Sequence, residues 1–534
     1  MKFSICQINP SVGDLKYNYE KIVKFYNKSI SSGCDIIIFP ELSITGYPPR
    51  DLLFEKKFID KNLMYAEKLS KLSTKPIIFG YVSRNRGKLY NSAGISFDGK
   101  LRFLYNKRLL PNYDVFDEHR YFFNGEDVGV YKLIYNNIKI KIGLQICEDL
   151  WDDNQELKVS EEQKENGAEI LINISASPFS IGKLEKRIKL IKKKIKELKL
   201  PFIYCNMVGA QDEIIFDGSS LAFSSTGSLI KQGKYFKECI SITNSNVKKS
   251  CSVIFQKKEK KIFNALCLGV SDYFSKTGHK EAVLGLSGGI DSALTAVIAV
   301  EALGLNNVHG VLLPSKFSSD HSLKDAESLA LNLKIDYRII PIQKSVDVLL
   351  NSLQKDFLGK ENDIAEENIQ SRVRGNILMA LSNKFGWLLL TTGNKTEIAL
   401  GYCTLYGDMN GGLAVISDLN KLEVYALSKW YNKFNNDRIP VNSINKMPSA
   451  ELSYNQVDPF DYKIISPLVD KLIENKIKLE ELVTDKVDLK FLKSLYKKIK
   501  TNEFKRYQST LGLKISEKAF GVGRRFPIVN NFDL

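Results

Sequence analysis

Histidine is scarce in this sequence, and its cysteines are scattered. The 534 residues include only four histidines, at positions 119, 279, 309 and 321, and eight cysteines, at 6, 34, 147, 205, 239, 251, 267 and 403. No Cys-x-x-Cys pair occurs, which excludes zinc and redox sites built on closely spaced cysteines. Most of these cysteines are therefore expected to be small buried hydrophobic residues.

Long apolar runs are also missing. Stretches such as 35–40 and 387–390 are far shorter than the roughly 20 residues needed to span a bilayer. The N-terminus enters a strand-like pattern at residues 2–9 without the basic head, apolar stretch and cleavage site of a signal peptide. We therefore predict no membrane contact and a cytoplasmic location.

Proline is infrequent, with 15 residues, and the chain is 44% hydrophobic and 26% charged, the composition of a folded protein. Its length exceeds one hydrophobic core, so two or three domains are expected. The net charge of +16 raises the possibility of nucleic-acid binding. The basic residues are mostly lysines on helices that also carry glutamates, which favours a lysine-rich proteome or attraction of small anions instead.

The hydrophobic pattern divides the chain into two α/β halves. Residues 1–245 alternate strand-like segments (2–9, 35–40, 76–83, 138–147 and 168–175) with helical ones (16–32 and 51–72), and Asp98-Gly99 marks a hairpin turn. An apolar stripe on a lysine-rich helix, expected to pack on a sheet, consists of Leu184, Ile188, Ile191, Ile195 and Leu198. The pattern breaks down near 238–260, which places a linker at 246–260.

Residues 261–534 form the second predicted domain. Helices at 261–276, 291–304 and 320–332 alternate with strands at 281–286, 307–313 and 335–341. Such alternation indicates parallel βαβ units in a doubly wound sheet, whose ligands bind at the carboxyl ends of the strands.

A glycine-rich turn joins the first of these strands to its helix. The segment Leu284-Gly-Leu-Ser-Gly-Gly-Ile-Asp-Ser292 can present successive backbone N–H groups at a helix N-terminus, which is an anion site. It lacks the lysine of a Walker loop. It resembles the Ser-Gly-Gly-x-Asp-Ser loop of ATP pyrophosphatases, which implies an adenine nucleotide alpha hydrolase-like fold and transfer of AMP to a substrate oxygen.

Further motifs in this half resemble the NAD synthetase family. They are Glu367–Gly375, Thr391–Glu397, Tyr406–Gly412, Pro448–Leu452 and Phe504–Gln508. The resemblance implies adenylation of the nicotinate carboxylate of nicotinic acid adenine dinucleotide (deamido-NAD), after which ammonia displaces AMP.

The same resemblance implies roles for individual residues. ATP would be bound by Gly285, Leu286, Ser287, Gly288, Gly289, Ile290, Asp291, Ser292 and Thr392, deamido-NAD by Asn368, Glu397 and Lys505, and Mg²⁺ by Asp291 and Glu397. Taken alone, Asp291 is equally explained as an acidic residue that favours the helix dipole. A basic cluster, read as a phosphate-facing flap or alternatively as a solvated tail, comprises Lys505, Arg506, Lys514, Lys518, Arg524 and Arg525.

In the first half, a cysteine ends an apolar strand in Ile146-Cys-Glu-Asp-Leu-Trp151. A lone cysteine there is usually structural, but Glu41 lies at another strand end and the segment 105–111 offers Lys107. Only His119 offers a histidine base in this half, so a carboxylate base with a lysine cation is the available alternative.

This Glu, Lys, Cys combination is similar to the nitrilase superfamily, and residues 111–122 resemble its glutaminase branch fused to NAD synthetases. The resemblance implies a four-layer α-β-β-α sandwich, with Glu41 as general base, Cys147 as nucleophile and Lys107 as stabiliser of the tetrahedral intermediates. Glutamine would be held by Tyr113, Ser177 and Lys183. Glu118 is either an assistant to these residues or a surface charge.

The two halves together predict an enzyme that amidates deamido-NAD with ammonia from glutamine, and the family implies a homo-oligomer. One alternative is another glutamine-dependent adenylating amidotransferase, which should lack the motifs at 448–452 and 504–508. A second is a tRNA-modifying protein, which would commonly carry zinc-binding cysteines or an RNA module. A third, a scaffold without activity, is disfavoured by the joint presence of six residues: Glu41, Lys107, Cys147, Ser287, Asp291 and Glu397.

Overall fold

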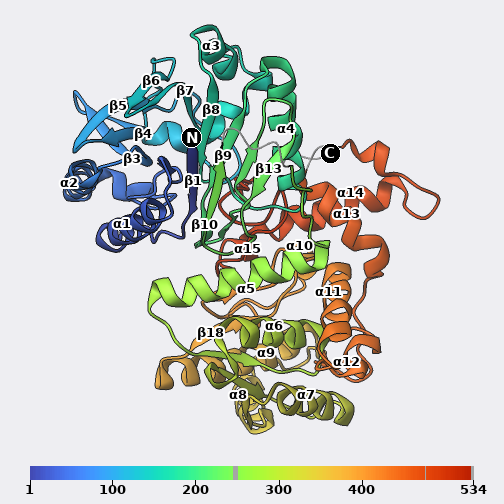
Figure 1. Cartoon of the computed structure of the whole chain (residues 1–534). Helices are drawn as coiled ribbons and strands as arrows, with labels where there is room; N and C mark the ends of the chain where they lie inside the picture. The colour runs from blue at the N-terminus through green and yellow to red at the C-terminus, as the bar shows by residue number, and fades with distance from the viewer. Residues whose placement is uncertain (245–249, 475–476, 531–534) are drawn as a thin grey trace. The chain divides into compact units, whose positions relative to one another are not determined.

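The computed structural model describes residues 1–244, 250–474 and 477–530 and divides the chain into two compact units, Met1–Lys257 and Lys258–Leu534. Among the residues described, no helix is both long and apolar enough to cross a membrane. Each unit is a mixed α/β structure (Figure 1).

The first unit contains two six-stranded sheets. One has the order β14-β1-β2-β3-β4-β5 and the other β13-β12-β9-β8-β7-β6. The first sheet consists of β14 (Cys239–Asn244), β1 (Lys2–Gln7), β2 (Ile36–Ile38), β3 (Ile77–Asn85), β4 (Lys88–Phe97) and β5 (Lys100–Asn106). The second consists of β13 (Leu229–Gln232), β12 (Leu221–Phe223), β9 (Phe202–Asn206), β8 (Ile170–Ser175), β7 (Ile138–Ile146) and β6 (Val130–Tyr135). A separate pair is β10 (Val208–Gln211) and β11 (Ile214–Asp217).

The sheets stack through apolar side chains and carry helices on their outer faces (Figure 1). Ile5, Ile38 and Ile78 of the first sheet pack against Ile172 and Ile203 of the second. Helices α1 (Leu15–Ser31) and α2 (Lys56–Leu72) cover the first sheet. Helices α3 (Val159–Glu165) and α4 (Lys183–Leu198) lie on the side of the second. This is the α-β-β-α sandwich that the sequence predicts.

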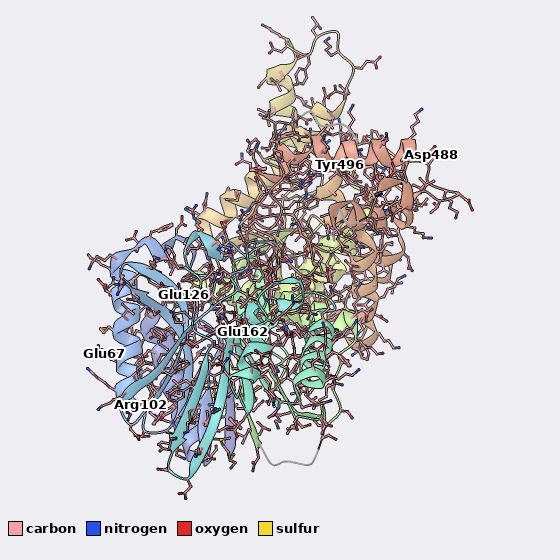
Figure 2. All side chains as sticks on the ribbon, turned by 90° about the horizontal axis from the view of Figure 1, so that it is seen from above. Glu67, Arg102, Glu126, Glu162, Asp488 and Tyr496 are labelled. Carbon is pink, nitrogen blue, oxygen red and sulfur yellow. The ribbon has the colours of Figure 1, made fainter. Side chains whose placement is uncertain are left out.

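The apolar stripe of α4 faces its sheet, as predicted, with Leu184, Ile188 and Ile191 in one buried cluster. Charged side chains such as Glu67 of α2 and Arg102 of β5 lie on the outer surface of the unit (Figure 2). The hairpin predicted at Asp98-Gly99 joins β4 to β5.

Two predicted elements differ from the structure. The helix expected at 51–72 is divided into a 3₁₀ turn, Arg50–Phe54, and α2, which begins at Lys56. The breakdown expected from residue 238 is wrong for Cys239–Asn244, which form β14 and pair with the whole of β1. Backbone pairing in the sheet here overrides the weak pattern of a Thr, Asn and Ser-rich segment.

The second unit is built on a five-stranded sheet of order β17-β16-β15-β18-β19, in which every pairing is parallel. Its strands are β15 (Ala282–Gly285), β16 (Val308–Leu312), β17 (Asp336–Ile339), β18 (Leu388–Thr391) and β19 (Leu413–Ala414). From β15 the chain runs to β16 and β17 and then crosses back to β18 on the other side of β15, so the topological switch point of this doubly wound fold lies between β15 and β18.

Helices surround this sheet. Those between its strands are α6 (Ile290–Leu303), α7 (Asp320–Leu333), α8 (Gln343–Leu353), α9 (Ile364–Phe385) and α10 (Lys395–Leu400). The helix preceding β15 is α5 (Lys258–Thr277). Those after β19 are α11 (Lys421–Phe434), α12 (Val441–Asn445), α13 (Tyr462–Glu474), α14 (Leu489–Thr501) and α15 (Glu503–Arg506). Helices α8 and α9 cover the sheet face that bears Val283, Val311 and Leu389.

Candidate active sites

The first site forms where strands end. Glu41 follows β2, Lys107 follows β5, and Cys147 follows β7, so the two sheets bring together the three residues predicted to be catalytic. Lys107 Nζ donates to Glu41 Oε1 at 2.8 Å and to Glu118 Oε1 at 2.8 Å. These residues and Cys147 are all buried, with residue exposures of 4% or less.

Charges determine which groups are ionised at this site. Burial alone lowers the pKa of Lys107, but the carboxylates of Glu118 and Glu41 outweigh it and raise that pKa well above its ordinary value. Burial raises the pKa of Glu118 to about 7 against the opposing effect of Lys107. Glu118 is thus part of the buried cluster and not the surface charge that the sequence left open.

The Cys147 thiol is neutral in this environment. Burial raises the pKa of Cys147 well above its ordinary value, Glu41 adds to that shift, and Lys107 opposes it. The residue also has a backbone φ of +42°, an unfavourable conformation for a side chain with a Cβ that is typical of active-site turns.

Asp149 holds the cysteine turn against the lysine segment. Its Oδ2 accepts from the Ile146 N–H at 2.9 Å, and its Oδ1 accepts from the N–H groups of Arg108 and Leu109 at 3.1 and 3.0 Å. This buried carboxylate therefore links the backbone before Cys147 to the backbone after Lys107. Sequence reasoning missed Asp149, although its place in Cys147-Glu-Asp149 was a usable signal.

The residues predicted to hold glutamine surround this cluster. The Tyr113 hydroxyl donates to both oxygens of Glu148, at 3.1 and 3.0 Å, and Glu148 is the neighbour of Cys147. Lys183 Nζ lies 4.1 Å from the centre of the Trp151 ring. Burial, and then the like charge of Arg187, lower the pKa of Lys183 to about 8. Ser177 is buried and adjoins Ala176, whose N–H donates to Glu41 Oε2 at 2.7 Å.

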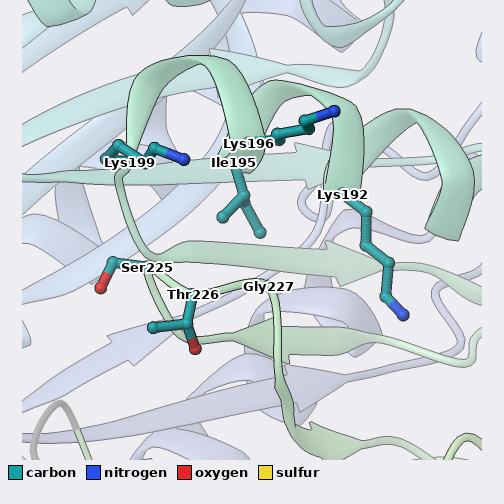
Figure 3. A pocket seen from close by; sticks show the side chains of 7 residues that line it. All are labelled: Lys192, Ile195, Lys196, Lys199, Ser225, Thr226 and Gly227. Atoms are coloured by element: carbon teal, nitrogen blue, oxygen red, sulfur yellow. The ribbon is translucent and has the colours of Figure 1, made fainter.

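A separate pocket in the same unit contains none of these residues. It is lined by Lys192, Ile195, Lys196, Lys199, Ser225, Thr226 and Gly227, between the end of α4 and the turn joining β12 to β13 (Figure 3). Its lining residues include no carboxylate, thiol or histidine.

The second site lies at the carboxyl end of β15, as predicted. Gly288, with φ of +74°, directs the loop into the N-terminus of α6. A Cβ at Gly288 would stand 2.2 Å from the Ser322 carbonyl oxygen, so only glycine fits. The Ser287 and Ser292 hydroxyls lie 3.1 Å apart, and Ser287 Oγ accepts from the Gly289 N–H at 3.2 Å.

Asp291 and Glu397 converge on one cation, Lys421. Lys421 Nζ lies 2.5 Å from Asp291 Oδ2 and 3.1 Å from Glu397 Oε1. Asn394 Nδ2 donates to Asp291 Oδ1 at 2.9 Å, and the Asn394 N–H donates to Glu397 Oε2. Burial raises the pKa of Glu397 to about 7, opposed by Lys421. Lys421 carries no local sequence signal in so lysine-rich a chain and was missed.

The other predicted residues of this unit lie around the same region. Thr392 stands between β18 and α10. Asn368 Oδ1 accepts from the Thr404 hydroxyl at 2.8 Å, and Lys505 Nζ donates to the carbonyls of Gly401 and Cys403 at 2.7 and 2.8 Å. Lys505 thus attaches α15 to the segment after α10. No group of three or more His, Cys, Asp or Glu side chains suited to a metal occurs among the described residues.

Several members of the basic cluster serve the chain's own structure. Arg506 donates to the carbonyls of Ile398 and Ala399 and to Glu503, to which Arg524 also donates. Lys514 Nζ donates to the carbonyls of Ser516 and Glu517. Part of the basic cluster therefore forms hydrogen bonds within the chain itself.

Comparison with known proteins extends over both units. The carbon-nitrogen hydrolase family matches residues 2–250, and the NAD synthase family matches residues 262–509. A glutamine-dependent NAD(+) synthetase of Thermotoga maritima is 38% identical over 100% of this chain and 99% of its own. That of Synechocystis sp. is 40% identical over 99% of this chain and 98% of its own.

The chain belongs to the glutamine-dependent NAD(+) synthetase family. A solved glutamine-dependent NAD(+) synthetase, that of Acinetobacter baumannii in complex with ADP, covers 99% of this chain and 98% of its own, with 34% identity and a TM-score of 0.79. The predicted fold class and family are confirmed. The protein is a ligase that amidates deamido-NAD to NAD with ATP, using ammonia released from glutamine.

A substitution at Gly80 of β3 would test how strongly the glutamine-driven reaction depends on the position of Glu41. A Cβ on Gly80 would lie 2.3 Å from the Leu42 nitrogen and 2.7 Å from the Glu41 Cα. Because both are backbone atoms, Gly80→Ala must displace the segment that carries Glu41. We expect glutamine-driven NAD formation to fall by about 100-fold, as a displacement of about 1 Å can cause, while ammonium-driven formation is retained.

Gly87→Ala is the matched control, because no atom lies within 4 Å of its Cβ position in the hairpin between β3 and β4. Both reactions are measured for each variant by NAD formation. An equal loss in the two variants would contradict the argument, since it would point to general backbone strain.

Proposed function

We propose that glutamine is hydrolysed in the first unit by Glu41, Lys107 and Cys147. The observation that carries this proposal is the buried cluster in which Lys107 Nζ lies 2.8 Å from Glu41. As the Cys147 sulfur attacks the glutamine amide carbon, Glu41 takes the thiol proton and passes it to the leaving nitrogen, which departs as ammonia. Lys107 stabilises the negative oxygen of the tetrahedral intermediate.

The second half of this reaction regenerates the enzyme. Water attacks the carbonyl carbon of the glutamyl thioester while Glu41 takes one of its protons. Glutamate leaves, and the proton returns to the Cys147 sulfur. Because the cysteine is neutral before substrate arrives, proton transfer to Glu41 accompanies attack instead of preceding it.

We further propose that Tyr113, Ser177 and Lys183 hold the substrate glutamine. Lys183 supplies a cation for the α-carboxylate and stands near the ionisable groups of Cys147 and Glu148, which affect its pKa. Lysine offers one ammonium group where arginine would offer a bidentate fork. A single charge that titrates close to neutral pH is therefore expected to make glutamine binding depend on pH.

In the second unit, we propose that residues 285–292 and Thr392 bind ATP, and that Asn368, Glu397 and Lys505 bind deamido-NAD. A nicotinate carboxylate oxygen attacks the α-phosphorus, and pyrophosphate leaves. Ammonia then attacks the acyl carbon, AMP departs, and one proton is lost. The glycine-rich loop at the N-terminus of α6 supports a phosphate site there.

Asp291 and Glu397 fit a magnesium ion, since Mg²⁺ is usually bound by one or two carboxylates together with substrate phosphates. Both already converge on one positive group, Lys421 Nζ. Once bound, the ion would stabilise negative charge developing at the α-phosphate.

A cytoplasmic location also remains part of the proposal, because ATP is supplied there. Assembly into a homo-oligomer remains an expectation from the family resemblance.

Cys147→Ala is the direct test of the division of labour. We expect it to abolish NAD formation driven by glutamine and to leave formation driven by ammonium within about twofold, because ammonia enters after the step that needs the thiol. The assay measures NAD from deamido-NAD and Mg-ATP with each nitrogen source. Cys34→Ala, which removes another buried thiol, is the control and should retain both reactions.

The efficiency with which glutamine is used should decrease at alkaline pH. The Lys183 cation is present below its pKa of about 8 and is lost above it, so kcat/KM for glutamine should decline as the pH rises through 8. Lys183→Arg keeps its charge throughout this range and should shift the decline upward. The check is a pH profile of initial rates for both proteins, and identical profiles would exclude Lys183 as the titrating group.

Lys421→Met should leave Asp291 and Glu397 facing each other without their cation. We expect the variant to lose about 3 kcal/mol of stability, the scale for breaking a buried ion pair. Added Mg²⁺ should then raise its thermal midpoint more than that of the wild type, because the ion replaces the missing charge. Lys433→Met, at an exposed position of the same helix, is the control, and an equal Mg²⁺ effect in all three proteins would contradict the expectation.

A further inference from the structure

Arg187 of α4 is fully buried and has no part in the chemistry above. Its Nη1 donates to both oxygens of Asp217, at 2.8 and 3.1 Å. Its Nη2 donates to the carbonyls of Ser177 and Pro178, at 2.9 and 3.2 Å. Burying a guanidinium costs free energy unless it is paired and hydrogen-bonded. Two of these four hydrogen bonds go to the backbone of the segment that carries Ser177.

The backbone of Ser177 is fixed at both ends by one network. The Ser177 N–H donates to Asn206 Oδ1 at 2.9 Å, while its carbonyl accepts from Arg187. Asn206 Nδ2 also lies 3.3 Å from Asp217 Oδ1, so both anchors of Ser177 meet at the same carboxylate. The preceding residue, Ala176, donates its N–H to Glu41. Through Ala176, the network therefore reaches the side chain of Glu41, the proposed general base.

Arg187 also acts on Lys183, which lies one turn earlier on α4. The charged or ionisable groups that affect Lys183 are Arg187 and Lys186 on its own helix and Cys147 and Glu148 from the cysteine turn, and the Trp151 ring covers its ammonium. Among these charged groups, Arg187 has the largest effect, and it lowers the pKa of Lys183.

We propose that Arg187, held by Asp217, is the positioning residue of the glutamine site. It touches no substrate and acts through two others: it fixes the Ser177 backbone, and it places a like charge beside Lys183. The inference rests on the proposed role of Ser177 and Lys183 in binding glutamine.

Two variants separate the hydrogen bonds that Arg187 makes to the Ser177 segment from the effect of its charge on Lys183. Arg187→Lys keeps the positive charge but cannot bind Asp217 and two carbonyls together. Its KM for glutamine should rise about tenfold, the effect of losing one or two hydrogen bonds, with the alkaline decline unchanged. The double variant R187M/D217N removes both charges and leaves no unpaired buried ion. Its KM should rise similarly, and its alkaline decline should move to higher pH because Lys183 has lost its like-charged neighbour.

The matched control is K194M/D152N, which removes a buried pair two turns further along α4. Lys194 Nζ lies 2.5 Å from Asp152 Oδ1, and its other charged partners are Asp153 and Glu161. This control should leave KM for glutamine and the pH profile unchanged. Ammonium-driven NAD formation should stay within about twofold in every variant, because that reaction needs no glutamine site.

The possible results distinguish a failure of the Arg187 proposal from a failure of the proposed glutamine site. If Lys183→Met leaves KM for glutamine unchanged, the proposed glutamine site is wrong whatever Arg187 does. If Lys183→Met raises KM but R187K and R187M/D217N only lower kcat, with KM and the pH profile as in the wild type, Arg187 is merely structural and the inference is overturned. A raised KM in both Arg187 variants with a shifted pH profile only in the double variant supports it.

Discussion

The chemistry proposed for the first unit depends on one contact, the ammonium of Lys107 shared between the carboxylates of Glu41 and Glu118 at 2.8 Å each. Glu41, Lys107, Glu118 and Cys147 are all buried, so a charge on any of them is stabilised mainly by its protein neighbours. Burial is the main cause of the raised pKa of Cys147, the Glu41 carboxylate adds to the shift, and Lys107 opposes it. The cluster therefore favours a neutral thiol until a substrate carbonyl is in place to receive the electron pair.

That arrangement requires accurate placement of three separate strand ends. Asp149 joins two of them, since it accepts N–H groups from both the Cys147 turn and the segment after Lys107. Glu41, at the third strand end, accepts the Ala176 N–H, which ties it to the end of β8 and the segment that carries Ser177. The unfavourable backbone conformation of Cys147 persists because these contacts on either side fix the turn. The sandwich thus stabilises a geometry that isolated segments would not adopt.

The helices, the strands and the proposed catalytic residues were predicted from the sequence more fully than the buried side chains that hold them in place. Periodicity identified β1, α4 and the βαβ order of the second unit because burial imposes a repeat on each. Glu41 and Cys147 stood out because each follows an apolar strand, and Lys107 completed the combination that resembles the nitrilase superfamily. Arg187 and Lys194 were hidden, since they occupy a helix whose lysine-rich faces were expected to meet solvent, yet both are buried. Their partners, Asp217 and Asp152, lie 30 and 42 residues away in sequence, so no local pattern reveals them.

Both units hold a lysine between two carboxylates, but they differ in access to water. Glu41 and Glu118 are exposed by 0 and 5% beside Lys107, whereas Asp291 and Glu397 are each exposed by 17% beside Lys421. A buried ion pair exchanges partners only at the cost of desolvated charge. Lys107 is therefore suited to remain as a fixed group through every turnover. In the proposed ATP site, the more accessible carboxylates around Lys421 would accept a second cation brought by the nucleotide, as an enzyme that must admit and release a charged substrate in each cycle requires.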